Sequence, residues 1–188
     1  MKYPIAVLAA VAMVTSLSCA DIIHVPDDYG TIQAGINAAS NGDTVLVADG
    51  NYSGSGNVNI DFGGRAIVVM SENGPENCII SCAYTGRAFY FHSGETSSSV
   101  LDGFTVQNGS SSYGGGMNIT SSSPLIMHCI IANNNGTYGG GIYISSGSPI
   151  IVNCTISGNS ATNGGAVYAT NSNLRMTNSI VAFNTASG

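Results

Sequence analysis

Gly139-Gly140-Gly141-Ile142-Tyr143-Ile144 has a counterpart 25 residues earlier, Gly114-Gly115-Gly116-Met117-Asn118-Ile119, and another 25 residues later, Gly164-Gly165-Ala166-Val167-Tyr168-Ala169. Other positions of this period also agree along the chain: Cys129 aligns with Cys154 and Ser179, and Asn134 aligns with Asn159 and Asn184. A period of roughly 20 to 50 residues is typical of solenoid proteins. The repeat therefore predicts a chain wound into similar, stacked coils.

The residues within one period indicate which kind of solenoid this is. Each unit contains short alternating runs, such as 142–144 and 151–156, separated by Gly, Ser and Asn, and has no long helical pattern. This excludes helical repeats. We predict an all-β fold, a right-handed parallel β-helix of about three short strands per coil, with equivalent residues about 4.8 Å apart along the axis.

Stacking of equivalent coils should place like residues in columns. One inward column is expected to contain Phe89, Met117, Ile142 and Val167, and a second Ile126, Ile151 and Met176. Asn134, Asn159 and Asn184 should form a ladder in which side-chain amides hydrogen-bond from coil to coil. Cys129 and Cys154 should face each other in adjacent coils, either as reduced buried thiols or as a disulfide.

The chain divides into three segments. Residues 1–20, with Lys2, an apolar run over 5–14 and small residues near position 20, are predicted to be a secretory signal peptide rather than a transmembrane span. Residues 21–52 should form an N-terminal cap with a short α-helix over 31–39, capped by Thr31, and a strand over 44–47. Residues 53–188 should form the β-helix, with irregular coils first and regular coils from about 114.

The irregular part and the last coil carry further expectations. Strands are predicted over 58–60, 67–70, 78–80, 88–91 and 100–106. Because no polar cap follows Asn184, we expect either a longer natural chain or an end-to-end contact that covers the last coil. A short natural chain with a frayed last coil is the alternative.

The segments Ile23–Ala34, Gly42–Val47 and Gly50–Tyr52 resemble the opening of secreted pectin-lyase-like β-helix proteins. Gly35 stands where that group usually has Ala. The Gly-Gly-Gly-Ile and Asn-Cys-Thr-Ile-Ser-Gly-Asn blocks are similar to the group's generic repeats, and also to repeats of chlamydial polymorphic outer-membrane adhesins. The resemblance covers nearly all of 21–188 and implies the fold. Motifs that the active pectin-degrading enzymes carry, such as Asn-Thr-Asp, Gly-His-Gly and Trp-Ile-Asp-His, are missing from this sequence.

Charge and composition narrow the set of partners. Without residues 1–20 the chain has three arginines, no lysine and ten acidic residues, a net charge of −7. Nucleic acid is therefore not expected as a partner, and an acidic polysaccharide would be repelled unless calcium or the arginines bridged it.

The sequence has no Cys-x-x-Cys motif and no His pair at ligand spacing, so neither a metal site nor a cofactor is expected, except calcium if the chain is a lyase.

Two groups of residues could carry a function. Arg87, His92, Glu95 and Asp102 fall in adjacent irregular segments and could converge on one face with Arg65 as a catalytic group, or could be solvated loop charges with Arg87 paired to Glu95 or Asp102. Tyr90, Asn118, Tyr143 and Tyr168 should point outward from equivalent strands. We call these four residues the tyrosine stripe. Their rings and amide could bind sugars, or could pack across strands. Tyr113, Tyr138 and Asn163 form a second, neighbouring column.

Two functions follow as hypotheses. The leading one is a secreted or cell-surface, non-catalytic module with a structural or adhesive role, which contacts a polysaccharide or cell-surface glycan through the tyrosine stripe. The alternative is a polysaccharide lyase, esterase or glycoside hydrolase of the pectin-lyase-like group.

Overall fold

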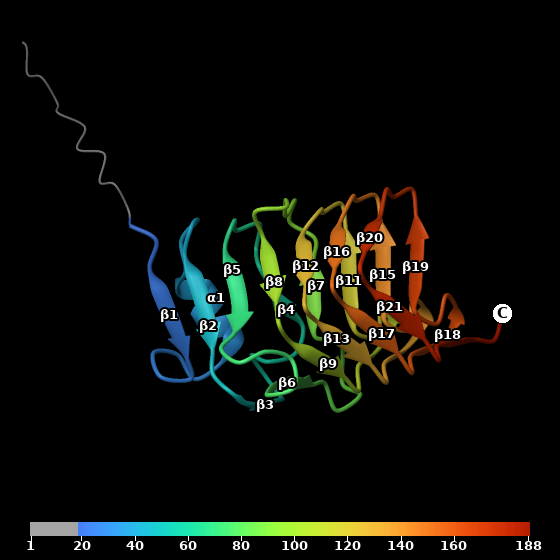
Figure 1. Ribbon diagram of the computed structural model, residues 1–188, viewed down its shortest axis with the longest axis horizontal. Helices are drawn as coiled ribbons and strands as arrows, with labels where there is room; N and C mark the ends of the chain where they lie inside the picture. The colour runs from blue at the N-terminus through green and yellow to red at the C-terminus, as the bar shows by residue number, and fades with distance from the viewer. Residues whose placement is uncertain (1–18) are drawn as a thin grey trace, which may run out of the picture.

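Short strands stack coil upon coil along one axis, which lies horizontally in Figure 1. The computed structural model describes residues 19–188. Every strand pair in these residues is parallel, so the predicted parallel β-helix is confirmed. The predicted signal peptide, residues 1–20, lies outside the described residues except for its last two positions.

The coils build four sheets. The seven-stranded sheet contains β1 (Ile22–Val25), β2 (Thr44–Val47), β5 (Val68–Ser71), β8 (Val100–Asp102), β12 (Leu125–Met127), β16 (Ile150–Val152) and β20 (Arg175–Thr177). The six-stranded sheet contains β3 (Gly50–Tyr52), β6 (Cys78–Ser81), β9 (Thr105–Gln107), β13 (Ile130–Ala132), β17 (Thr155–Ser157) and β21 (Ile180–Ala182). The five-stranded sheet contains β4 (Ile60–Asp61), β7 (Phe89–Phe91), β11 (Met117–Thr120), β15 (Ile142–Ser145) and β19 (Val167–Thr170).

The fourth sheet was not predicted, because we expected three strands per coil. It contains β10 (Ser110–Tyr113), β14 (Asn135–Tyr138), β18 (Ser160–Asn163) and β22 (Thr185–Ala186). These strands are polar and contain few core residues. Their sequences lack the apolar alternation by which strands are recognised, and backbone pairing between coils holds them in place.

The register of the coils follows the 25-residue period. Met117 pairs with Ile142 and Ile142 with Val167, each 25 residues apart, while Phe89 of the irregular part pairs with Met117 at a separation of 28 residues. In the seven-stranded sheet Ile126 pairs with Ile151, which pairs with Met176. The two predicted inward columns are thus present.

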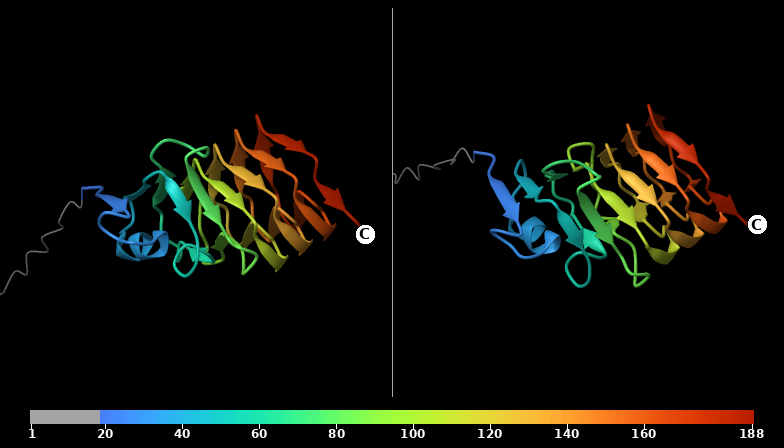
Figure 2. Two further views of the ribbon diagram at one scale, coloured as in Figure 1. Left: turned by 90° about the horizontal axis from the view of Figure 1, so that it is seen from below. Right: turned by 60° about the horizontal axis from the view of Figure 1, so that its bottom comes forward.

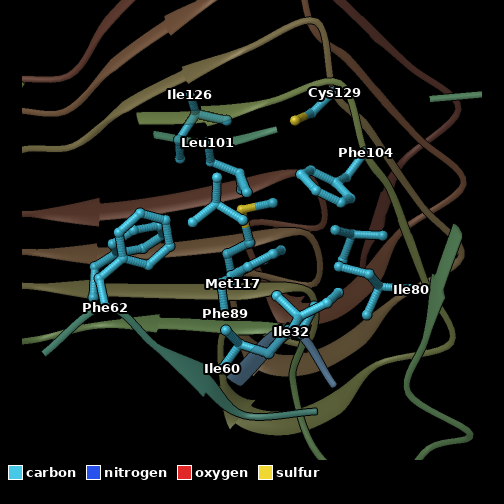
Figure 3. Packing of buried hydrophobic residues seen from close by; sticks show 14 of the residues in the cluster. Ile32, Ile60, Phe62, Ile80, Phe89, Leu101, Phe104, Met117, Ile126 and Cys129 are labelled. Carbon is cyan, nitrogen blue, oxygen red and sulfur yellow. The ribbon is translucent and has the colours of Figure 1, made fainter. Parts of the chain in front are cut away.

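The interior of the solenoid is filled by apolar side chains from three of the sheets. Figure 3 shows Phe89 and Met117 from the five-stranded sheet lying between Leu101 and Ile126 on one side and Ile60 on the other. Phenylalanines fill the irregular coils, where the Phe62 and Phe91 ring centroids lie 4.8 Å apart. The buried area of these side chains is the main favourable contribution to stability.

The N-terminal cap is built around helix α1 (Ile32–Ala38), which lies beside the first coils in Figure 2. Thr31 is its N-cap, and its Oγ1 accepts a hydrogen bond from the Ala34 amide at 3.2 Å. Gly35 faces the sheet so closely that a Cβ there would lie 2.9 Å from Val25 Cγ2. This contact gives a physical reason for Gly at a position where the resembling proteins usually have Ala.

Most strands of the irregular coils lie within two residues of their predicted bounds. The exception is the predicted strand 100–106, which is two strands, β8 and β9. Gly103 separates them with a φ of +80°, which is left-handed backbone, and so turns the chain from one sheet to the next.

The last coil differs from those before it in exposure. Its Ile180, Val181 and Phe183 side chains are exposed. Among residues 19–188, no helix is long and apolar enough to cross a membrane.

Candidate functional site

Aromatic side chains gather where the four-stranded and five-stranded sheets meet. Strands β10, β14 and β18 each end at a Gly-rich turn, after which the chain enters β11, β15 and β19. The first glycine of each turn has positive φ, 70° at Gly114 and Gly139 and 66° at Gly164. The turns bring the ends of the four-stranded sheet close to the five-stranded sheet, so that Tyr113 contacts Tyr143 of the next coil and Tyr138 contacts Tyr168.

Four tyrosines form a connected cluster at this edge, and we call Tyr113, Tyr138, Tyr143 and Tyr168 the tyrosine quartet. Its rings are near-parallel within a sheet, with centroids 5.5 Å apart for Tyr113 and Tyr138 and 5.9 Å for Tyr143 and Tyr168. Between the two sheets, Tyr113 meets Tyr143 and Tyr138 meets Tyr168 edge to face, with centroids 5.0 and 5.1 Å apart. Each such contact stabilises this arrangement of the rings by about 0.5 to 1.5 kcal/mol. A shallow depression of about 190 Å³ is lined by the quartet and Thr170.

The tyrosine stripe has the register expected from the sequence. Tyr90, Asn118, Tyr143 and Tyr168 are paired in turn across β7, β11, β15 and β19. Asn118 differs from the expected exposed position, because only 5% of its surface is accessible. Its Nδ2 donates to the Tyr113 carbonyl at 3.3 Å, and its Oδ1 accepts from Thr120 Oγ1 at 2.8 Å. Asn118 is therefore the buried member of the stripe.

Arg87 and His92 flank Tyr90 at the start of the stripe. The Arg87 guanidinium carbon lies 4.9 Å from the Tyr90 ring centroid, and its Nη2 donates to Ser111 Oγ at 2.7 Å. The His92 ring lies 4.0 Å from that of Tyr90, and its Nε2 is 3.3 Å from Asp61 Oδ2. Neither expected partner of Arg87, Glu95 or Asp102, is the one found.

Of the two alternatives for Arg87, His92, Glu95 and Asp102, convergence of all four on one face is not what the structure shows. Asp102 lies in the seven-stranded sheet, where its Oδ1 is 2.7 Å from His128 Nδ1. The other His128 ring nitrogen, Nε2, is 3.1 Å from Asn153 Nδ2 in the next coil. Arg87, His92 and Asp102 fall in adjacent segments of the sequence. The turn between β7 and β8, however, leads the chain from the five-stranded sheet to the seven-stranded sheet, so Asp102 lies apart from the other two.

Glu95 is a buried structural carboxylate, only 2% exposed. Its Oε1 accepts from the Gly64 amide at 2.9 Å, and its Oε2 accepts from the Ser93 amide at 2.9 Å and from Ser122 Oγ at 2.8 Å. Burial by itself would raise the pKa of Glu95, but the hydrogen bonds from Ser122, Ser93 and Gly64 outweigh it and lower the pKa. Glu95 thus joins three coils in its ionised form.

We expect Glu95→Gln to destabilise the protein by about 2 kcal/mol at pH 7, because a neutral amide replaces a carboxylate that accepts three hydrogen bonds. The folded-state pKa is lowered, so the stabilisation is complete above the unfolded pKa of about 4.3 and is lost as pH falls through the folded value. Urea denaturation between pH 3 and 7 measures this. An equal difference between the two proteins at every pH would contradict an ionised Glu95.

Two further columns bind coil to coil. The Asn134 amide and Nδ2 both donate to Asn159 Oδ1, at 2.9 and 3.0 Å, and Asn159 donates in the same way to Asn184 Oδ1.

The Cys129 amide donates to Cys154 Sγ at 3.4 Å, and both side chains are free thiols. Burial raises the pKa of Cys129, which favours the protonated thiol. No His, Cys, Asp and Glu cluster suited to a metal ion occurs within residues 19–188.

Comparisons with family models, curated proteins and solved structures found no match to this chain. Support for a function therefore comes from the arrangement of the side chains in this site. Sequence reasoning named the stripe and the column of Tyr113 and Tyr138 but did not join them, and it missed Asp61 as the partner of His92. The signal that the two tyrosine columns share an edge was the Gly-Gly turn, which leaves only four residues between Tyr113 and Asn118.

Proposed function

We propose that this protein is a non-catalytic β-helix module of the cell surface or extracellular space, which contacts glycans through the tyrosine stripe and quartet. The single observation that supports it most is the quartet, in which ring contacts of 5.0 to 5.9 Å fix aromatic side chains on a rigid sheet edge. Flat rings beside hydroxyl and amide groups suit the apolar faces and hydroxyls of sugars.

The location and the wider role are part of the same proposal. Secretion follows from the signal peptide expected over residues 1–20, and the pectin-lyase-like and outer-membrane adhesin resemblances support an extracellular, adhesive role.

The proposal is tested with the protein and a panel of insoluble polysaccharides, neutral and acidic, with and without calcium. Co-sedimentation measures binding, and reducing-end and unsaturated-product assays run on the same samples. Binding without product is the expected result. Release of product would overturn it in favour of a polysaccharide-active enzyme.

We expect the double substitution Tyr143→Ala and Tyr168→Ala to raise the Kd for a bound glycan about tenfold or more, since each lost ring removes about 1 kcal/mol of stacking. Tyr29→Ala is the matched control, because Tyr29 is an exposed tyrosine of the N-terminal cap. Equal Kd values for both variants would show that the quartet is not the binding surface.

A further inference from the structure

The tyrosine stripe is interrupted at one coil. Tyr90 on β7 and Tyr143 on β15 occupy equivalent positions two strands apart, with Asn118 on β11 between them. Neighbouring strands are about 4.8 Å apart, so these two tyrosines stand on strands about 10 Å apart. Asn118 is short and buried, and a depression lies over it that both tyrosines line.

The space over Asn118 is a surface depression, and the polar Asn118 side chain forms its base. It has a volume of about 280 Å³ and is lined by Tyr90, Tyr113, Asn118, Thr120, Tyr143 and Ser145. Asn118 is held at its base by hydrogen bonds to the Tyr113 carbonyl and the Thr120 hydroxyl. This fixed side chain keeps the depression open, and we call it the Asn118 slot.

We propose that the Asn118 slot binds a single pyranose ring of an uncharged glycan. The inference rests on the proposed function and deepens it. The Tyr90 ring already packs against His92 and the Arg87 guanidinium, and the Tyr143 ring packs against Tyr113. The sugar would therefore be held by the tyrosine edges and hydroxyls at its sides and by the Asn118 amide beneath it, within the volume of about 280 Å³.

The chemistry of the lining selects the class of sugar. None of its six residues is charged, and all of them offer hydroxyl or amide groups, which bind sugar hydroxyls. Arg87 is the cation beside Tyr90, and Ser111 Oγ and the Tyr90 ring already hold its guanidinium. The chain as a whole has a net charge of −6, which opposes an acidic sugar.

The decisive variant is Asn118→Tyr, which fills the slot with the residue found at the equivalent position in β7, β15 and β19. The probes are soluble oligosaccharides of glucose, mannose and xylose, with oligogalacturonate as the acidic probe. Calorimetry measures the Kd, and tyrosine fluorescence follows binding because the chain has no tryptophan. We expect the Kd for the neutral oligosaccharide that binds the unmodified protein to rise at least tenfold, while circular dichroism shows that the variant remains folded.

Two further variants separate blockage from misfolding. Ser145→Tyr narrows the slot from its rim without touching the Asn118 hydrogen bonds and should weaken binding in the same way. Thr177→Tyr adds a tyrosine at an exposed strand position of the seven-stranded sheet, outside the slot, and should leave the Kd within about threefold.

The outcomes distinguish this inference from the proposed function. If Asn118→Tyr leaves the Kd unchanged or lowers it, sugars stack on a longer aromatic surface, and the slot is wrong although glycan binding stands. Tighter binding of oligogalacturonate than of every neutral probe would overturn the uncharged class. Absence of binding to any probe or polysaccharide would overturn both.

Discussion

Replacing Asn159 with alanine is expected to lower the free energy of unfolding by about 3 kcal/mol or more. Asn159 is fully buried, and its side chain bonds in both directions along the axis. Without it, the Asn134 amide loses its acceptor, and the Ile131 carbonyl loses the Asn159 Nδ2 donor at 2.8 Å. Each buried polar group left unsatisfied costs about 1 to 3 kcal/mol.

Urea denaturation followed by circular dichroism measures this effect. Asn173→Ala is the matched control in the next coil, because Asn173 is exposed and should change stability by no more than about 0.5 kcal/mol. Asn184→Ala should fall between the two, since Asn184 lies in the last coil and is only partly buried. Similar losses for Asn159→Ala and Asn173→Ala would mean that the ladder contributes little.

Replacing Gly140 with alanine is expected to prevent stable folding of the regular coils, a loss above about 4 kcal/mol. A Cβ at Gly140 would overlap the Ser160 carbonyl oxygen and lie 2.5 Å from the Gly165 carbonyl oxygen. Both are backbone atoms of the next coil, so the clash is relieved only by separating coils that parallel pairing holds together.

Thermal unfolding and the yield of soluble protein report this loss. Gly30→Ala is the matched control, because a Cβ at Gly30 has no atom within 4 Å. An unfolding midpoint for Gly140→Ala within about 2 °C of the unmodified protein would contradict the close approach of these two coils.

The columns could be predicted from sequence because each depends only on the period. Once the Gly-Gly turns at 114, 139 and 164 are aligned, the ladder of Asn134, Asn159 and Asn184 and the pairing of Cys129 with Cys154 follow from strand spacing alone. The cap helix was also predictable, since Thr31 and the apolar positions that follow it form a local pattern.

The remaining features depend on contacts that no local pattern records. The polar strands β10, β14, β18 and β22 are held by backbone bonds between coils rather than by apolar side chains. Glu95 is buried because of donors 27 and 31 residues away in the chain. Asn118 has the outward register of a surface residue, yet it is buried at the base of a depression that three tyrosines from other strands line.

The 25-residue register also limits how the length of this molecule can change. A duplication of residues 114–138 would keep every strand in register and add one strand to each sheet, extending the solenoid by about 4.8 Å. An insertion of a few residues within a strand would instead shift every later side chain out of its column. The distance that such a protein spans can therefore change only in fixed increments of one coil, like the graduations of a ruler.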